Sequence, residues 1–159
     1  MDKEEFRRQV LQKLETDRQL LLDAAKHAHA TATHEDNIPD NKYETFALES
    51  SYLAQGQANR AQEIRQAIDL WRNLQMRTFG DSSEIRMSAL VLLEDEDGNQ
   101  RAVFLAPAAG GLVVNYHNRD VMLISPDSPL GQELIGRGVD DSFLLESGAR
   151  REYEIIEIE

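Results

Sequence analysis

Four carboxylates gather around Pro39. They are Glu35, Asp36, Asp40 and Glu44. Carboxylates this close repel one another unless solvent, a cation or a basic partner lies between them. Oxygen ligands of this kind suit Mg²⁺ or Mn²⁺ better than a soft metal. Because Mg²⁺ usually keeps waters or shares its ligands with a phosphate-bearing site, Asp36 and Asp40 are better suited to completing another molecule's metal site than to holding an ion alone.

A second interpretation of these carboxylates needs no metal. Aspartate is a good helix N-cap, so Asp36 or Asp40 would equally serve to cap a helix that begins after the turn. The remaining carboxylates would then lie in solvent. The residue types alone leave both interpretations open.

Other residue types offer weaker candidates. His27 and His29 do not share a helix face, and no HExxH spacing exists, so a zinc site is not expected. Arg65 and Arg72 are seven positions apart and share a helix face, where they would contact either nucleic-acid phosphates or solvent alone. The chain has no cysteine and no suitable Ser/His/Asp set. We therefore expect no catalytic site of its own and no enzyme.

The carboxylates fall between two long helical patterns. The first covers residues 2–33, which contain neither Gly nor Pro, and the second runs over about 40–76. Pro39 cannot continue a helix already running. We predict an antiparallel coiled-coil hairpin over residues 1–79 with an acidic tip near 34–41, although two helices of an ordinary bundle would show the same periodicity. The apolar stripes are Phe6, Val10, Leu14, Leu21, Ala24, Ala28 and Ala32, then Ala47, Ala54, Ala61, Ile64, Ile68 and Trp71.

After a short linker near residue 80 the periodicity changes to that of β-strands. Residues 84–159 predict an α+β unit, a small antiparallel sheet with one short helix. In the segment SPLGQELIG, Ser128 is the expected N-cap of that helix and Pro129 its first residue. The expected strands are 88–93, 100–106, 112–116, 121–125, 142–146 and 152–158.

Charge separates the same two halves. The net charge of −12 argues against a protein that coats nucleic acid by bulk electrostatics. Residues 1–80 hold 11 Lys and Arg against 13 Asp and Glu, whereas residues 81–159 hold 6 against 16. An almost neutral half joined to a strongly acidic one suggests two units with different neighbours. No run of about 18 apolar residues and no secretion signal is present, so we expect no membrane contact and a cytoplasmic location.

Two segments resemble a known family. Residues 124–159, which read ISPDSPLGQELIGRGVDDSFLLESGARREYEIIEIE, resemble the end of the bacterial GreA/GreB transcription elongation and transcript cleavage factors. Residues 36–53, DNIPDNKYETFALESSYL, resemble the acidic tip of that family running into its second helix. The resemblance extends over nearly the whole chain. It implies a coiled-coil domain followed by an FKBP-like domain.

The resemblance also implies a function. In that family the globular domain grips the rim of the RNA polymerase secondary channel, and the coiled coil reaches the active centre. Tip carboxylates there help to hold the second Mg²⁺ of the polymerase and promote hydrolysis of backtracked RNA. The factor needs no cofactor of its own, and it meets nascent RNA or DNA only within the elongation complex. Asp127, Ser128 and Pro129 match the rim-gripping loop, although Ser128 and Pro129 also simply begin a helix.

One departure from the family pattern falls at the tip. Asp36 matches the tip aspartate, but the tip glutamate falls on Pro39, and Asp40 occupies the next position. Two functions follow as alternatives: a cleavage-stimulating elongation factor, with Asp36 and Asp40 as ligands shared with the polymerase, or a cleavage-inactive regulator that occupies the same channel. A coiled-coil adaptor with no polymerase contact is a third hypothesis from another class.

Overall fold

The computed structural model describes residues 1–33 and 41–159. The predicted acidic tip, including Asp36 and Asp40, therefore lies outside the described residues apart from the first residue of the second helix. Both long helices are present, α1 over Lys3–Thr33 and α2 over Asn41–Asn73. No helix among the described residues is long and apolar enough to cross a membrane.

The helices form because their apolar residues recur at helical spacing and because nothing interrupts them except Gly56 in α2. Most of the predicted stripe is buried or half-buried, but Ala24 is exposed and Ala25 is half-buried in its place. The stripe therefore continues four residues after Leu21 and not three. The buried apolar residues of the described helix positions are Phe6, Val10, Leu14 and Ala28 in α1, and Ala61, Ala67, Ile68 and Trp71 in α2.

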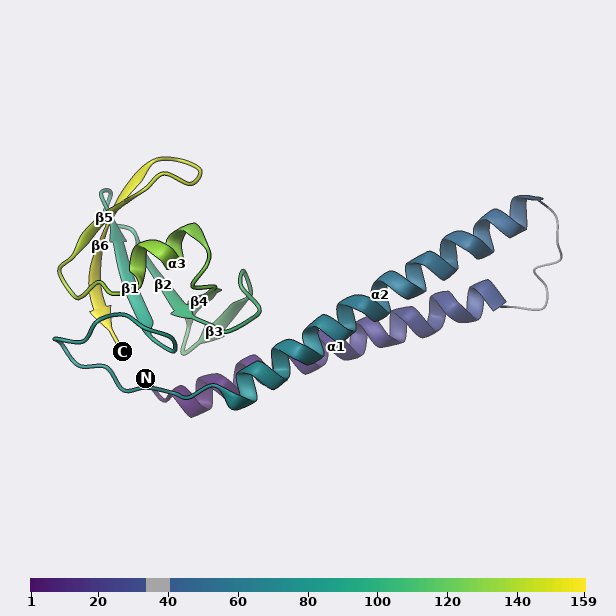
Figure 1. Ribbon diagram of the computed structural model, residues 1–159, viewed down its shortest axis with the longest axis horizontal. Coiled ribbons are helices and arrows are strands. Elements are labelled where there is room, and N and C mark those ends of the chain that lie inside the picture. The colour runs from purple at the N-terminus through teal and green to yellow at the C-terminus, as the bar shows by residue number, and fades with distance from the viewer. Residues whose placement is uncertain (34–40) are drawn as a thin grey trace. The chain divides into compact units, whose positions relative to one another are not determined.

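Six strands and one short helix follow in the predicted order (Figure 1). The sheet order is β3-β4-β2-β1-β6-β5. The sheet is antiparallel as expected, with one exception: β2 and β4 pair in parallel. The exception arises because β3 and β4 form a hairpin that folds back beside β2, so its second strand runs in the same direction as β2. The bounds are Leu90–Asp95 for β1, Gln100–Leu105 for β2, Val113–Tyr116 for β3, Arg119–Ile124 for β4, Pro129–Leu134 for α3, Ser142–Leu145 for β5 and Arg151–Ile158 for β6.

The main hydrophobic core lies between α3 and one face of the sheet. Leu130 and Leu134 of α3 pack there against the alternate, inward-facing residues of the strands. This arrangement fixes α3, and with it the loop that precedes the helix, against the sheet. The buried strand residues of this core are Val91, Leu93, Val103, Leu105, Ile124, Phe143, Ile155 and Ile158.

An aromatic cluster covers the opposite face of the sheet. The ring of Phe6 lies 5.0 Å from that of Phe104, 5.6 Å from that of Tyr116 and 6.4 Å from that of Trp71, centroid to centroid. The Trp71 indole N–H donates to the carbonyl of Ala108 at 3.1 Å. The beginning of α1 and the end of α2 thus belong to the sheet unit. Residue contacts divide the chain in the same way, into Met1–Val10 with Leu70–Glu159, and Leu11–Asp69.

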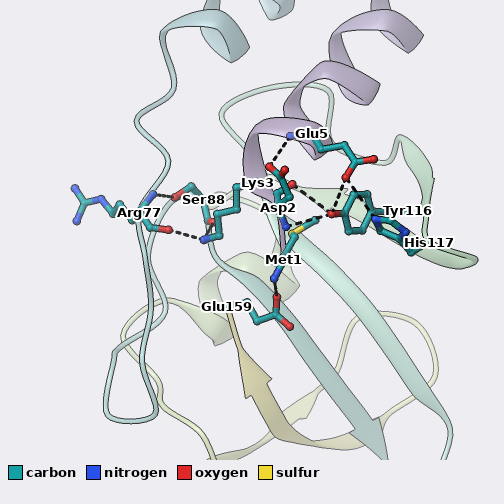
Figure 2. A network of polar contacts seen from close by, with 9 residues as sticks. All are labelled: Met1, Asp2, Lys3, Glu5, Arg77, Ser88, Tyr116, His117 and Glu159. Carbon is teal, nitrogen blue, oxygen red and sulfur yellow. Dashed lines mark hydrogen bonds and ion pairs between the residues drawn. The ribbon is translucent and has the colours of Figure 1, made fainter.

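Polar contacts fasten the N-terminus within the sheet unit (Figure 2). The Lys3 ammonium donates to the carbonyls of Arg77 at 2.6 Å and Ser88 at 2.8 Å. Burial lowers the pKa of Lys3 to about 8, and the nearby Glu159 carboxylate partly opposes that shift. The Met1 ammonium pairs with the side chain of Glu159. The residue that begins α1 is therefore tied to both ends of the segment that joins α2 to β1.

Candidate partner-binding site

The loop before α3 is held in place by its own serines. Ser128 caps the helix: its Oγ accepts from the Gly131 N–H at 3.1 Å and donates to the Ser125 carbonyl at 2.7 Å. Pro129 occupies the first turn, where its missing N–H costs nothing. The predicted cap and first helical residue are both confirmed by this geometry. The partner-binding role predicted for them stays a prediction at this stage.

Gly131 lets the helix sit directly on this loop. A Cβ atom built at this position would lie 2.0 Å from the Ser125 carbonyl oxygen and 2.9 Å from the Pro126 Cα. Both atoms are backbone, so no side-chain movement relieves the overlap. The close approach of α3 to the loop therefore requires glycine, and it fixes where Asp127 and Pro129 emerge.

The loop presents Asp127 and Pro129 to solvent, and both residues are exposed. The backbone of Asp127 is held on both sides, because its N–H donates to Ser125 Oγ at 3.2 Å and its carbonyl accepts from Gln132 Nε2 at 3.3 Å. Within the described part of the chain, the Asp127 carboxylate makes no hydrogen bond or ion pair. A fixed backbone that carries an unused carboxylate and an exposed proline ring is suited to contacting a partner.

A groove of about 490 Å³ opens beside this loop on the α3 face of the sheet. Its walls are mostly apolar. One charged side chain, Arg101, lines it, and the guanidinium of Arg101 contacts the Met122 sulfur at 2.9 Å. The lining residues are Arg101, Gly110, Gly111, Met122, Leu123, Ile124, Ser125, Ser128, Pro129, Leu130, Leu145 and Ser147.

Of the other predicted site residues, the structure describes only Arg65 and Arg72. Arg65 and Arg72 are both exposed on α2. Whether they contact phosphates stays a prediction. Asp36 and Asp40 are outside the described residues. Among the residues that are described, no group of three or more His, Cys, Asp or Glu side chains is placed to hold a metal ion.

Sequence reasoning missed two residues of this site, Arg101 and Gly131. Arg101 alternates with Val103 and Leu105, so it is a charge at a core-facing position of a strand, and that pattern was readable in the sequence. Gly131 gave a weaker signal, a glycine inside a six-residue helix. Its role depends on a contact with the loop that no sequence pattern predicts.

Comparison with known proteins identifies the chain. The family described as "Transcription elongation factor, GreA/GreB, C-term" matches residues 80–159. The chain belongs to this family of transcription elongation factors. At the level of the family its partner is RNA polymerase. A search of curated proteins finds no match.

Solved structures give similar proteins. The GreA factor homolog 1 (Gfh1) protein of Thermus thermophilus is 23% identical, with 96% of this chain and 94% of that chain covered and a TM-score of 0.42. Gfh1 of Thermus aquaticus is 24% identical, with 92% and 89% covered and a TM-score of 0.41. The transcription elongation factor GreA/GreB of Nitrosomonas europaea is 20% identical, with 60% and 90% covered and a TM-score of 0.34.

Proposed function

We propose that this chain docks on RNA polymerase through the loop before α3 and the groove beside it. The observation that carries the proposal is the fixed loop that presents Asp127 and Pro129 in the domain that defines the family. The acidic character of this half, with 6 basic and 16 acidic side chains in residues 81–159, suits a basic rim on the partner.

The chemistry of the proposal belongs to the polymerase. The carboxylates of Asp36 and Asp40 would enter the secondary channel and help to hold the second Mg²⁺ of the polymerase active site. The two-metal site of the polymerase would supply the chemistry, namely activation of the attacking water and stabilisation of the leaving oxygen of the backtracked RNA. The chain supplies charge and position and performs no reaction alone. This step is supported by the sequence of the tip and by family membership.

A second candidate function is favoured by Pro39. The family's tip glutamate falls on this proline, which offers no ligand, and Asp40 stands one position further along. A factor that docks in the same channel without completing the metal site would regulate initiation or pausing by occupying it. The two candidates share the docking step and differ only at the tip.

A cleavage assay separates them. Wild-type protein is added to stalled, backtracked elongation complexes with Mg²⁺, and shortening of the RNA is followed over time. The first candidate requires enhanced shortening that is lost in the double variant Asp36→Ala with Asp40→Ala. Inhibited transcription without shortening selects the second candidate. In that case Pro39→Glu, which restores the family's residue, is expected to introduce cleavage.

Docking is tested independently of cleavage by equilibrium binding to RNA polymerase core enzyme. We expect the double variant Asp127→Ala with Pro129→Ala to bind at least about ten-fold more weakly than wild type, since few interface residues carry most of the binding energy. Asp81→Ala is the control, because Asp81 is exposed and its change removes the same charge outside the groove. Equal weakening by both changes would contradict docking at the loop.

A further inference from the structure

Arg101 occupies an unusual position for a charged side chain. It is the second residue of β2 and faces the same side of the sheet as Val103 and Leu105, which are fully buried. Arg101 itself is half-buried and lines the groove. Its guanidinium is therefore held against apolar walls while remaining reachable from solvent.

The charge of Arg101 is not neutralised within the described part of the chain. Its contact with the Met122 sulfur supplies only a weak acceptor. Three other arginines of this half have carboxylates at salt-bridge distance: Arg86 with Glu84 at 2.7 Å, Arg137 with Glu133 at 2.8 Å and Arg151 with Asp95 at 2.7 Å. Arg119 and Arg150 have no such partner among the described residues, but both are exposed to solvent, whereas Arg101 is half-buried. In residues 81–159, where 16 acidic side chains outnumber 6 basic ones, an arginine without a carboxylate partner is available for one from outside.

We infer that the groove binds an apolar protein segment that carries an acidic side chain, and that Arg101 selects this segment by pairing with its carboxylate. The inference rests on the proposed docking function and specifies the partner chemistry at that same site. Arginine pairs with carboxylate through two parallel hydrogen bonds, which fixes direction as well as distance. The apolar walls lower the local dielectric, so such a pair is stronger here than on an open surface.

The groove does not suit a nucleic acid. Nucleic-acid binding depends on several cations that follow the phosphates, and this groove holds one cation in a strongly acidic half of the chain. The apolar lining from Met122, Leu130 and Leu145 instead suits aliphatic or aromatic side chains of a protein segment. A volume of about 490 Å³ holds a few such side chains and not a whole element.

Two electrostatic effects of opposite sign act at this surface. The acidic half as a whole attracts a basic partner, so removing any arginine from it should leave binding unchanged or strengthen it. The specific pair predicts the reverse for Arg101 alone. A variant at this position therefore distinguishes a local carboxylate contact from bulk attraction by the direction of the change in affinity.

The test measures equilibrium binding of the full chain to RNA polymerase core enzyme. We expect Arg101→Gln to bind roughly ten-fold more weakly than wild type, as for loss of a charge-assisted hydrogen-bonded pair, and Arg101→Glu more weakly still. Arg101→Lys keeps the charge and should recover part of the loss. Arg86→Glu is the matched control for charge reversal, because Arg86 is exposed and does not line the groove; it should change affinity by less than about two-fold or strengthen binding. Thermal unfolding of each variant confirms that the domain stays folded.

The outcomes are distinct. Unchanged or tighter binding by Arg101→Gln, with Asp127→Ala and Pro129→Ala still weakening it, overturns the role of Arg101 and leaves the docking proposal intact. Equal weakening by Arg101→Glu and Arg86→Glu also overturns it, because the loss of affinity would then not be specific to the arginine that lines the groove. If wild type does not bind the polymerase, the docking function fails and this inference fails with it.

Discussion

At Gly131 the backbone of α3 touches the backbone of the loop that carries Asp127, and the two features are inseparable. Gly131→Ala would push a Cβ to within 2.0 Å of the Ser125 carbonyl oxygen. We expect a loss of stability of about 1–3 kcal/mol, as for other overpacked sites, together with weaker polymerase binding because the loop must move. Urea unfolding followed by fluorescence of Trp71, the single tryptophan and a member of the sheet unit, measures the first effect.

Gly56→Ala provides the contrast. Gly56 lies inside α2, where an added Cβ would meet no atom within 4 Å and where the backbone has no left-handed angle. Because alanine is the better helix former, we expect the substitution to stabilise α2 by about 0.5–1 kcal/mol. Far-ultraviolet circular dichroism follows the helices. Destabilisation by both glycine changes, or by neither, would contradict a role specific to Gly131.

Lys3 gives the sheet unit a dependence on pH. Burial lowers the Lys3 pKa to about 8, whereas an unfolded lysine titrates near 10.5. Between these values the unfolded chain binds more protons, so the free energy of unfolding should rise with pH from about 8 to about 10.5. Removing the amine in Lys3→Met should abolish that rise. The comparison is made by urea unfolding of both proteins at about pH 7, 8.5 and 9.5, which bracket the lowered pKa, followed by Trp71 fluorescence.

A difference between wild type and Lys3→Met that stays constant over this range would contradict the lowered pKa. The neutral amine still carries two N–H groups, enough to donate to the carbonyls of Arg77 and Ser88. Deprotonation therefore removes the cost of burying a charge without removing either hydrogen bond. The expected effect has the opposite sign to that of a lysine held in a salt bridge.

At the scale of elements, the sequence pattern was sufficient to predict those features that depend on neighbouring residues alone, such as where a helix begins or ends. The helices end close to where helical periodicity ends, and the serine-proline pair correctly predicts the start of α3. The pairing of strands could not be predicted in this way. Strand β4 pairs in parallel with β2 because the hairpin of β3 and β4 folds back beside β2, and the residue pattern within the two strands does not indicate that arrangement. The same limit hid the groove, whose lining brings together residues of β2, β4 and α3 with residues of the loops before β3 and after β5.

The start of α1 and the end of α2 belong to the sheet unit, and Phe6 of α1 makes the ring contacts that join them to it. The side chain of Phe6 is fully buried and contacts the rings of Trp71, Phe104 and Tyr116. We expect Phe6→Ala to destabilise the sheet unit by about 3–5 kcal/mol through the lost ring and the cavity left behind. Leu20→Ala, in the same helix but 63% exposed, should cost no more than about 0.5 kcal/mol. Chemical unfolding monitored at Trp71 tests both.

A small effect of Phe6→Ala on the Trp71 transition would mean that α1 does not support the sheet. A small effect combined with a large loss of helical circular dichroism would have the same meaning, because the ring would then act only within the helices. The two probes are needed because the chain forms two units, and a single transition is not guaranteed.

At the scale of the whole molecule, the two units carry charge of different kinds. The sheet half holds most of the net negative charge and the docking loop, whereas the nearly neutral half holds the clustered carboxylates at Pro39. Negative charge spread over a domain steers association with a basic partner, but it has no fixed geometry with which to hold a metal. Carboxylates concentrated within a few residues contribute little to steering but can together hold a metal ion. Docking and metal-site chemistry should therefore be separable by mutation.

If the chain is a cleavage-stimulating factor, variants of the docking loop and variants of the tip should differ in their effect on RNA shortening. In an assay of RNA shortening against factor concentration, Asp127→Ala with Pro129→Ala should raise the half-saturating concentration at least about ten-fold yet reach the wild-type rate at saturation, because only affinity has changed. Asp36→Ala with Asp40→Ala should do the reverse, binding with wild-type affinity while stimulating no shortening at any concentration. Because the second variant still occupies the polymerase, it should also compete with wild type and suppress its stimulation. A docking variant that cannot be rescued by concentration, or a tip variant that fails to compete, would show that the two functions are not divided between the halves of the chain.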